Sequence, residues 1–412
     1  MIDKLMLKIL VLDDEPFMLK LLARMLTNQG FTSVSLCESG RAALDQVDNL
    51  DTRPNLILLD LNMPEMDGIE FIRHLVERNY TGSLILISGE DERMLQTVEK
   101  LVQAHKITVL GHIHKPVNAE ALSALLEKWT PSSLDSPKAQ KNYGADEVRA
   151  AIKNGELVNY YQPKVAVATG KVAGVETLVR WRHPVHGIVP PDLFIGVAEA
   201  NGLIDDLTRV VLTSALAQAK AWHDAGLALR VAVNVSMDSL ASLDFLDFVT
   251  ELTAKTGISP QEIVLEVTES QLMRDARIPL EILTRLRLNR FRLSIDDFGT
   301  GHSSLAQLRD IPFDELKIDQ SFVHRASSVE TLRAMYDASL ALARQLGMEV
   351  VAEGVEDRDD WDLLLRTGCD LAQGAFISRP MLAEDLPGWM EVWQERVRNK
   401  FAKDVDESQA HE

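Results

Sequence analysis

The sequence has almost no cysteine, a shortage of basic residues and no long uncharged apolar run. Only Cys37 and Cys369 occur among its 412 residues, which excludes a disulfide framework and favours a reducing compartment. No charge-free apolar stretch approaches the roughly 18 residues that a membrane span needs, and the charged N-terminus does not resemble a signal peptide. We therefore expect a cytoplasmic protein without a membrane span.

Basic residues are outnumbered throughout. The chain has 43 Lys and Arg against 62 Asp and Glu, a net charge of -19. Because contacts to nucleic-acid phosphates need clustered Lys and Arg, a nucleic-acid polymer is excluded as a partner. The remaining composition, 46% hydrophobic and 25% charged, is that of a globular protein, and at roughly 150 residues per domain the chain has room for two or three domains.

Alternating short apolar runs and amphipathic stretches divide the chain into domains. Residues 1–129 are predicted to form five strands and five helices, a doubly wound, flavodoxin-like parallel α/β domain. Residues 130–145, which are polar and contain Pro and Ser, predict a linker. The alternation resumes over residues 146–400, and about 250 residues is the usual length of a (β/α)₈ barrel. Residues 401–412 are expected to form a polar tail.

Polar side chains stand at the ends of the N-terminal apolar runs: Asp13, Asp14, Asp60, Ser88 and Lys115. The carboxyl ends of parallel strands meet at one edge of a sheet, so these groups are expected to lie together. Three neighbouring carboxylates need a hard cation such as Mg²⁺ between them. With that cation in place Asp60 would be a nucleophile for a phosphoryl group, whose oxygens Lys115 and Ser88 would bind.

This arrangement, with the segment DLNMPEMDG that begins at Asp60, resembles the receiver domain of two-component response regulators. The resemblance implies that Asp60 is the phosphoacceptor and that one cation is bound by Asp13, Asp14 and the Asn62 carbonyl. It also implies a sensor histidine kinase or phosphotransfer protein as partner.

Ser88 and Lys115 would be the switch pair of that receiver domain. The family usually has an aromatic residue three positions before the lysine, where this chain has His112. This departure leaves phosphorylation intact and puts the usual ring-rotation coupling in question.

In the second domain, polar residues again follow or end the apolar runs. If these runs are barrel strands, the polar groups converge on one mouth: Glu176, Asn234, Glu266, Asp296, Asp297, Lys317, Glu353 and Gln373. The oxygen donors, without His or Cys, favour Mg²⁺ or Mn²⁺ over Zn²⁺, and their number suggests two ions bridged by Asp296. Two such ions would hold a phosphodiester and activate a water, with Lys317 orienting that water and Arg180 binding a phosphate.

Ordered motifs in this domain resemble the EAL family of cyclic di-GMP phosphodiesterases: YYQPKV (160–165), GVETLVRW (174–181), NVS (234–236), EVTES (266–270), IDDFGTGHSSL (295–305), LKID (316–319), VAEGVE (351–356) and QGAFISRP (373–380). The resemblance implies a (β/α)₈ barrel with one reversed strand. It implies two-metal hydrolysis of cyclic di-GMP to linear pGpG, and a homodimer or higher homo-oligomer.

The resemblance also implies roles for single residues. The first metal would be held by Glu176, Asn234, Glu266 and Asp296, and the second by Asp296, Asp297 and Glu353. Lys317 would contact the hydrolytic water. Substrate contact or ordering of the site would come from Gln162, Arg180 and Gln373. Glu269 would brace the loop 298–304. Glu356 would contact the metal ligands without binding a metal itself.

Three positions depart from the family pattern: Thr177 replaces an alanine, His302 a tyrosine and Ala375 an aromatic residue. None removes a matched metal ligand. Two other functions remain open at this stage, namely a barrel that binds the nucleotide or a protein partner without hydrolysis, and a barrel enzyme that abstracts a proton through Lys317 beside a metal-stabilised enolate. Phosphorylation of Asp60 is expected to change the barrel's activity, in a direction that the sequence does not give.

Overall fold

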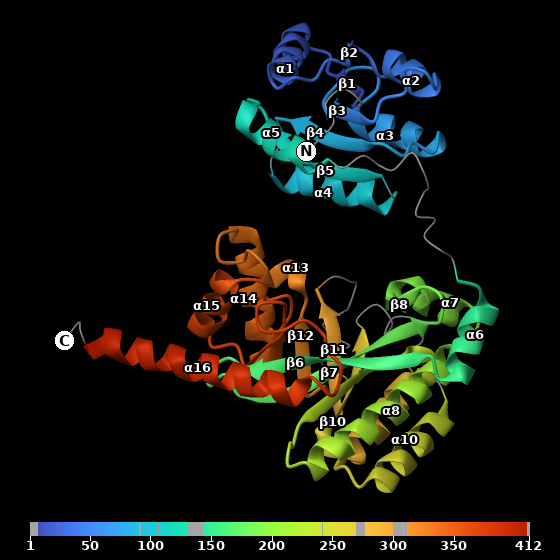
Figure 1. Cartoon of the computed structure of the whole chain (residues 1–412), viewed down its shortest axis with the longest axis vertical. Helices are drawn as coiled ribbons and strands as arrows, with labels where there is room; N and C mark the ends of the chain where they lie inside the picture. The colour runs from blue at the N-terminus through green and yellow to red at the C-terminus, as the bar shows by residue number, and fades with distance from the viewer. Residues whose placement is uncertain are drawn as a thin grey trace. The chain divides into compact units, whose positions relative to one another are not determined.

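The computed structural model describes residues 7–89, 92–105, 107–129, 143–240, 242–268, 277–299, 308 and 311–409. The chain divides into two compact units, Met1–Ala139 and Gln140–Glu412 (Figure 1). Among the described residues, no helix has the length and apolar character needed to cross a membrane.

The N-terminal unit is a parallel five-stranded sheet in the order β2-β1-β3-β4-β5, as expected for a flavodoxin-like fold. Its strands are β1 (Ile9–Leu12), β2 (Val34–Cys37), β3 (Leu56–Asp60), β4 (Ser83–Ser88) and β5 (Thr108–His114). Its helices are α1 (Pro16–Asn28), α2 (Gly40–Asp48), α3 (Gly68–Glu77), α4 (Glu92–Ala104) and α5 (Ala119–Glu127).

Alternation along the central strands gives this sheet two apolar faces. In β1, Ile9 and Val11 pack with α1 and α5, whereas Leu10 and Leu12 pack with α2, α3 and α4. Because successive strand residues point to opposite faces, continuous apolar strands are needed when both faces are covered. Polar residues end β3 (Asp60) and β4 (Ser88) at the carboxyl edge of the sheet, where the candidate site lies.

The C-terminal unit contains a closed barrel. Its strands are β6 (Leu157–Ala166), β7 (Val172–His183), β8 (Gly187–Val189), β9 (Arg230–Asn234), β10 (Ile263–Thr268), β11 (Arg292–Phe298), β12 (Glu315–Ile318), β13 (Glu349–Ala352) and β14 (Leu371–Ala372). Its helices are α6 (Ala145–Asn154), α7 (Ile195–Ala200), α8 (Ile204–Asp224), α9 (Met237–Leu240), α10 (Leu243–Thr256), α11 (Arg277–Leu288), α13 (Gln320–Val323), α14 (Glu330–Gln345), α15 (Arg358–Thr367) and α16 (Leu386–Gln409), with the 3₁₀ turns Pro191–Leu193 and Pro260–Glu262.

Strand pairing follows the order β6-β14-β13-β12-β11-β10-β9-β7, and a β6–β7 pairing closes the ring. Strand β6 is antiparallel to both of its neighbours, β7 and β14, while the other ring pairs are parallel. The expected barrel with one reversed strand is therefore confirmed. Strand β8 extends the sheet beyond the ring by pairing with β7.

Helix α8 shows how the sequence covers this barrel. Its buried side chains recur every three or four residues and form one stripe: Ile204, Leu207, Thr208, Val211, Leu212, Ala215, Leu216, Ala219 and Trp222. This spacing places an apolar face of the helix against the strands.

Three features differ from the simplest expectation. Strand β7 does not end at Glu176 but continues to His183, because its outer part pairs with both β6 and β8. Helix α16 continues across the boundary expected at residue 400, as far as Gln409. Tyr143, within the expected linker, is buried in the barrel unit's core, whereas residues 130–142 lie outside the described part of the chain.

Candidate functional site

The predicted N-terminal cluster is brought together at the carboxyl edge of the sheet. Asp60 ends β3, Asp13 follows β1, and both are buried. The Lys115 ammonium lies 2.7 Å from Asp60 Oδ2 and 3.1 Å from Asp13 Oδ2. Oxygens of Asp13, Asp14 and Asp60 lie within 4.8 Å of one another, so the donor set fits a hard divalent cation.

Burial and charge act in opposite directions in this cluster. Burial raises the pKa of Asp13, although the Glu15 backbone N–H and Lys115 oppose that rise. Burial lowers the pKa of Lys115, but its hydrogen bonds to Asp60 and Asp13 outweigh this effect and the pKa is raised. The lysine is thus held as a cation facing the predicted phosphoacceptor.

The predicted switch residues lie on β4 and β5 or directly after them, and their contacts differ. Ser88 is fully buried at the end of β4, and its backbone carbonyl accepts the Lys115 N–H at 2.8 Å. The Asn62 N–H donates to Asp60 Oδ1 at 3.2 Å. His112 lies on β5, where its Nδ1 is 2.9 Å from Glu99 Oε1 on α4. The histidine therefore joins β5 to α4.

Lys317 is the centre of the barrel cluster. Its ammonium is buried and lies 2.8 Å from Glu353 Oε1, 2.9 Å from Asp296 Oδ1, 3.2 Å from Glu266 Oε2 and 3.5 Å from Glu176 Oε1. These residues come from five different strands or strand ends, so the barrel itself assembles the group. Burial lowers the pKa of Lys317, but the carboxylates raise it well above its ordinary value.

Amide side chains orient Glu176 within this cluster. Asn234 Nδ2 donates to Glu176 Oε1 at 3.0 Å, and Gln373 Nε2 donates to Oε2 at 2.6 Å. The same Gln373 nitrogen lies 3.0 Å from Gln162 Oε1. Burial raises the pKa of Glu176, yet Lys317, Lys164 and these two hydrogen bonds bring it down to about 2.

Two groups of carboxylates at the mouth fit divalent cations. Oxygens of Glu176, Glu266 and Asp296 lie within 4.8 Å of one another, as do oxygens of Asp296, Asp297 and Glu353. Asp296 belongs to both groups, as the two-metal interpretation requires. Asp297 adopts a positive φ of 56°, and its backbone N–H donates to Asp296 Oδ1 at 2.9 Å.

The pKa values of three of these acids show the effect of crowding. Burial raises the pKa of Glu266 to about 8 against the opposing effect of Lys164 and Lys317. Burial, Asp296 and Asp319 raise that of Asp297 to about 6, and burial raises that of Glu353 well above its ordinary value. A divalent cation bound among these acids would favour their ionised forms, as expected for carboxylates that act as metal ligands.

A cavity of about 520 Å³ opens beside the cluster, between β7 and helices α7 and α8. Its wall includes Thr177, Asn234 and Asp297 together with apolar residues such as Ile195 and Leu207. The cavity is of the size that binds small ligands.

The remaining predicted residues have more varied positions. The Arg180 guanidinium donates to the Val179 carbonyl at 2.9 Å and lies over the Tyr160 ring. Ala375 is exposed and Thr177 is buried. Glu269, His302 and the loop residues 300–304 lie outside the described residues.

Glu356 is not brought into the strand-end cluster. Its side chain is 56% exposed, and its carboxylate is 3.8 Å from His324 Nε2. Its backbone N–H donates to Asp360. Within the described residues, Glu356 therefore lies beside a separate group, which it contacts through His324 and Asp360.

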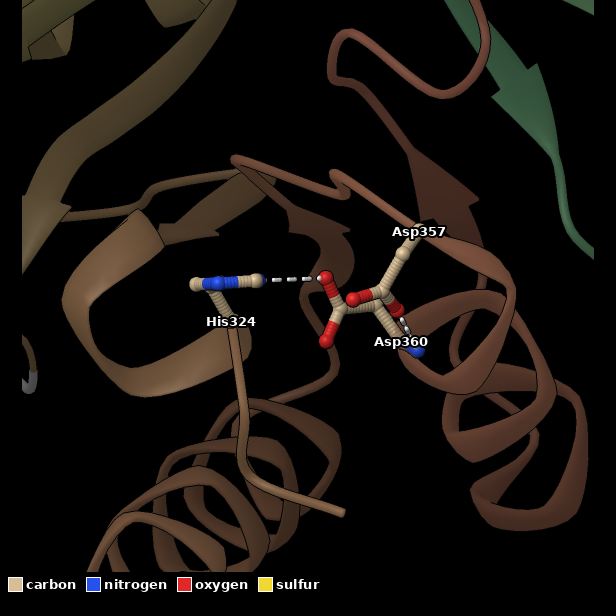
Figure 2. A group of neighbouring side chains, drawn as sticks. All are labelled: His324, Asp357 and Asp360. Carbon is tan, nitrogen blue, oxygen red and sulfur yellow. Dashed lines mark hydrogen bonds and ion pairs between the residues drawn. The ribbon is translucent and has the colours of Figure 1, made fainter. Parts of the chain in front are cut away.

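That separate group consists of His324, Asp357 and Asp360 (Figure 2). The buried Asp360 carboxylate accepts the N–H groups of Arg325 (3.1 Å) and Glu356 (3.0 Å), and contacts His324 Nδ1 at 2.9 Å. Asp357 caps α15 by accepting the Asp360 N–H. The Asp360 oxygens are thus engaged in joining the loops that follow β12 and β13.

Comparison with known proteins decides the family. The family model named EAL domain matches residues 145–380, and that named response regulator receiver domain matches residues 9–127. The chain belongs to the EAL domain family. Its N-terminal unit is a receiver domain, as the first motifs indicated.

Relatives and solved structures in the EAL family agree with this assignment. The cyclic di-GMP phosphodiesterase RocR of Pseudomonas aeruginosa is 33% identical over 91% of this chain and 96% of its own length. The bifunctional diguanylate cyclase/cyclic di-GMP phosphodiesterase MucR of the same organism is 40% identical over 62% of this chain, which is 37% of that protein.

Among solved structures, a PaMucR phosphodiesterase in complex with c-di-GMP is 41% identical. It covers 58% of this chain and 98% of its own, with a TM-score of 0.56. The EAL enzyme Bd1971, bound to cAMP and cyclic di-GMP, is 26% identical. It covers 78% of this chain and 79% of its own, with a TM-score of 0.57.

Sequence reasoning missed two buried charges of this EAL barrel. Lys164 Nζ lies 2.6 Å from Glu266 Oε1 and 2.9 Å from Glu315 Oε1. A signal was available, because Lys164 is two residues from Gln162 and Glu315 two residues from Lys317. Because successive strand residues point to opposite faces, Lys164 lies on the same face as Gln162, and Glu315 on the same face as Lys317.

Proposed function

We propose that this protein is a response regulator whose EAL barrel hydrolyses cyclic di-GMP to linear pGpG in a metal-dependent reaction. The observation that carries the proposal is the contact of Lys317 with four carboxylates from separate strands at the barrel mouth. The similarity to RocR over 96% of that protein supports the same activity for the whole chain.

Glu176, Asn234, Glu266 and Asp296 would hold one Mg²⁺ or Mn²⁺, and Asp296, Asp297 and Glu353 a second. When bound, such ions hold phosphate oxygens and make a water nucleophilic near neutral pH. The proximity of the two carboxylate groups, with Asp296 in both, supports this division.

The chain's own residues would position the remaining reactants. The Lys317 ammonium, held by Glu353 and Asp296, would donate a hydrogen bond to the attacking water and balance charge in the transition state. Gln373, which donates hydrogen bonds to Glu176 and to Gln162, would keep Glu176 in place, with Gln162 beside it near the substrate. The cavity beside Thr177 would receive the nucleotide.

In the receiver domain, Asp60 would accept a phosphoryl group from a sensor histidine kinase or a phosphotransfer protein, with one cation on Asp13, Asp14 and the Asn62 carbonyl. Lys115 and Ser88 would bind the phosphate oxygens, and the change would alter the hydrolysis rate of the barrel. We also propose a cytoplasmic location, which the two free buried thiols support. The protein would form a homodimer or a higher homo-oligomer.

The test of the enzyme is direct. Full-length protein with Mg²⁺ or Mn²⁺ is incubated with cyclic di-GMP, and the products are separated by chromatography. We expect pGpG from the wild type and from Glu251→Gln, an exposed acid on α10, and none from Glu176→Ala. Tight nucleotide binding without hydrolysis in either metal would instead identify a non-catalytic effector.

The test of regulation compares acetyl-phosphate-treated wild type with Asp60→Asn. Mass spectrometry first confirms phosphorylation of the wild type alone. A changed hydrolysis rate in the phosphorylated sample is expected, and equal rates in the two samples would refute control by Asp60.

A further inference from the structure

A chain of buried ionic contacts continues below the carboxylates of the mouth. Lys164 Nζ contacts Glu266 Oε1 at 2.6 Å and Glu315 Oε1 at 2.9 Å. Ser294 Oγ donates to the same Glu315 oxygen at 2.9 Å. Lys164 is 3% exposed, Glu315 1%, and Glu266 and Ser294 are fully buried. The proposed hydrolysis does not itself use Lys164, Glu315 or Ser294.

Lys164 spans the inside of the barrel. It lies on β6, and its two partners lie on β10 and β12, each three strands away around the ring in opposite directions. Its register partner on β7 is Gly174, which has no side chain. Because the lysine is held by two partners on the far wall, its ammonium has a fixed position.

The two oxygens of Glu266 are divided between two lysines. Oε1 contacts Lys164, while Oε2 lies 3.2 Å from Lys317, the cation at the mouth. Both oxygens contact an ammonium, but the contact of Oε1 is the shorter by far, so Oε2 is the oxygen more available to a metal cation. Lys164 therefore selects which oxygen Glu266 presents.

We propose that Lys164 is a positioning residue for Glu266: it holds Oε1, so that Oε2 faces the cation site. The inference rests on the proposed function, because it takes Glu266 as a metal ligand. Outer partners of metal ligands fix ligand orientation, and their loss typically weakens metal binding by about 10–100-fold.

A purely structural role must be separated from this one. Removing one member of a buried ion pair leaves an uncompensated charge, whereas replacing both by neutral groups of similar size is far better tolerated. The double variant Lys164→Met/Glu315→Gln keeps the net charge of the barrel unchanged, and it removes the Lys164–Glu315 ion pair together with the contact of Lys164 to Glu266. Any change in metal affinity then reports the position of that carboxylate.

The experiment measures Mn²⁺ binding to metal-stripped full-length protein by calorimetry, with the thermal midpoint recorded alongside. We expect the double variant to retain a wild-type midpoint and to bind Mn²⁺ about 10–100-fold more weakly. Wild-type affinity in a folded double variant would overturn the proposal and leave Lys164 a structural role alone.

The single variant Lys164→Met gives a second, independent reading. It adds one net negative charge to the interior, which by electrostatics alone would strengthen cation binding. We expect weaker Mn²⁺ binding, because misplacement of Glu266 outweighs the added charge; stronger binding would contradict positioning.

Arg230→Met/Glu349→Gln is the control, since this partly exposed ion pair joins β9 to β13 without contacting the predicted ligands. Glu349 also pairs with Arg292 at 2.8 Å, so the change leaves Arg292 without that carboxylate. We expect a changed midpoint and unchanged Mn²⁺ affinity. If the wild type does not bind Mn²⁺, the proposed function itself is refuted. If the wild type and both Lys164 variants bind Mn²⁺ equally, only this inference is refuted.

Discussion

The Lys317 ammonium lies 2.8 Å from Glu353 Oε1, across the parallel pair β12 and β13. The same ammonium contacts carboxylates from β7, β10 and β11. In the part of the chain that the structure describes, the cations paired with this group of acids are Lys317 and Lys164. Lys317 is thus both a candidate participant in hydrolysis and a counter-ion that keeps the acids together.

Lys317→Met is therefore expected to lower the free energy of unfolding in EDTA by about 3–5 kcal/mol, the cost of leaving buried charges unpaired. Mn²⁺ should restore stability more in this variant than in the wild type, because a divalent cation replaces the missing charge. Thermal unfolding with and without Mn²⁺ measures both effects. An equal response of the two proteins to Mn²⁺ would contradict the counter-ion role.

Gly354 allows the loop after β13 to approach α13 closely. It has a φ of 63°, and a Cβ placed on it would lie 2.2 Å from Gln320 Cβ. We expect Gly354→Ala to destabilise the protein by about 1–3 kcal/mol beyond the cost of the backbone conformation, and to reduce hydrolysis because Glu353 adjoins it.

Gly347→Ala is the control, because Gly347 has a similar φ of 72° and open space around its Cβ position. It should show only the conformational cost, about 1–2 kcal/mol, with normal turnover. Equal losses of stability in the two variants would show that contact with Gln320 is unimportant.

Asp360 joins two loops through three contacts. Asp360→Asn offers one acceptor oxygen instead of two, so a buried N–H loses its partner and stability should fall by about 1–3 kcal/mol. The neighbouring Asp357→Asn should be nearly neutral, since Asn caps a helix as well as Asp does. Chemical denaturation of both variants measures the difference.

His324 should make stability depend on pH. Its hydrogen bond to Asp360 raises its pKa, burial opposes the rise, and Asp360, Glu356 and Asp357 add attraction for the imidazolium. A histidine whose pKa is higher in the folded state than in the unfolded state stabilises the folded protein while it is protonated. This contribution is complete below the pKa of the unfolded state, about 6.5. The contribution is lost as pH rises through the folded value.

The stability difference between wild type and His324→Gln should consequently be largest below about pH 6.5 and shrink in alkaline solution. Urea unfolding of both proteins over this range tests the prediction. A difference that is constant with pH would show that the interaction does not need the charged imidazole.

Much of the site was predictable because parallel strands bring sequence-distant residues to one edge. Asp13 and Asp60 in one unit, and Glu266, Asp296 and Lys317 in the other, follow from this rule. The position of Glu176 within a longer strand did not, since β7 continues beyond it by pairing with β6 and, from Trp181 on, with β8.

The contacts of Lys164 and of Asp360 were not predicted. Each depends on which side chain reaches across the barrel or between loops, and the strand pattern gives only the face on which a residue lies. Lys164 also stands in a strand between Pro163 and Val165, where a lysine is easily taken for a surface residue.

The antiparallel direction of β6 has a consequence for how the barrel is tethered. Leu157, at the start of β6, pairs with Trp181, toward the carboxyl end of β7. The polypeptide arriving from the N-terminal unit therefore enters the barrel at the rim where substrate would bind, rather than at the closed floor. The residues that lead into β6 pack at this same rim, where Tyr143 lies against Trp181, so the attachment point of the barrel unit adjoins the predicted site.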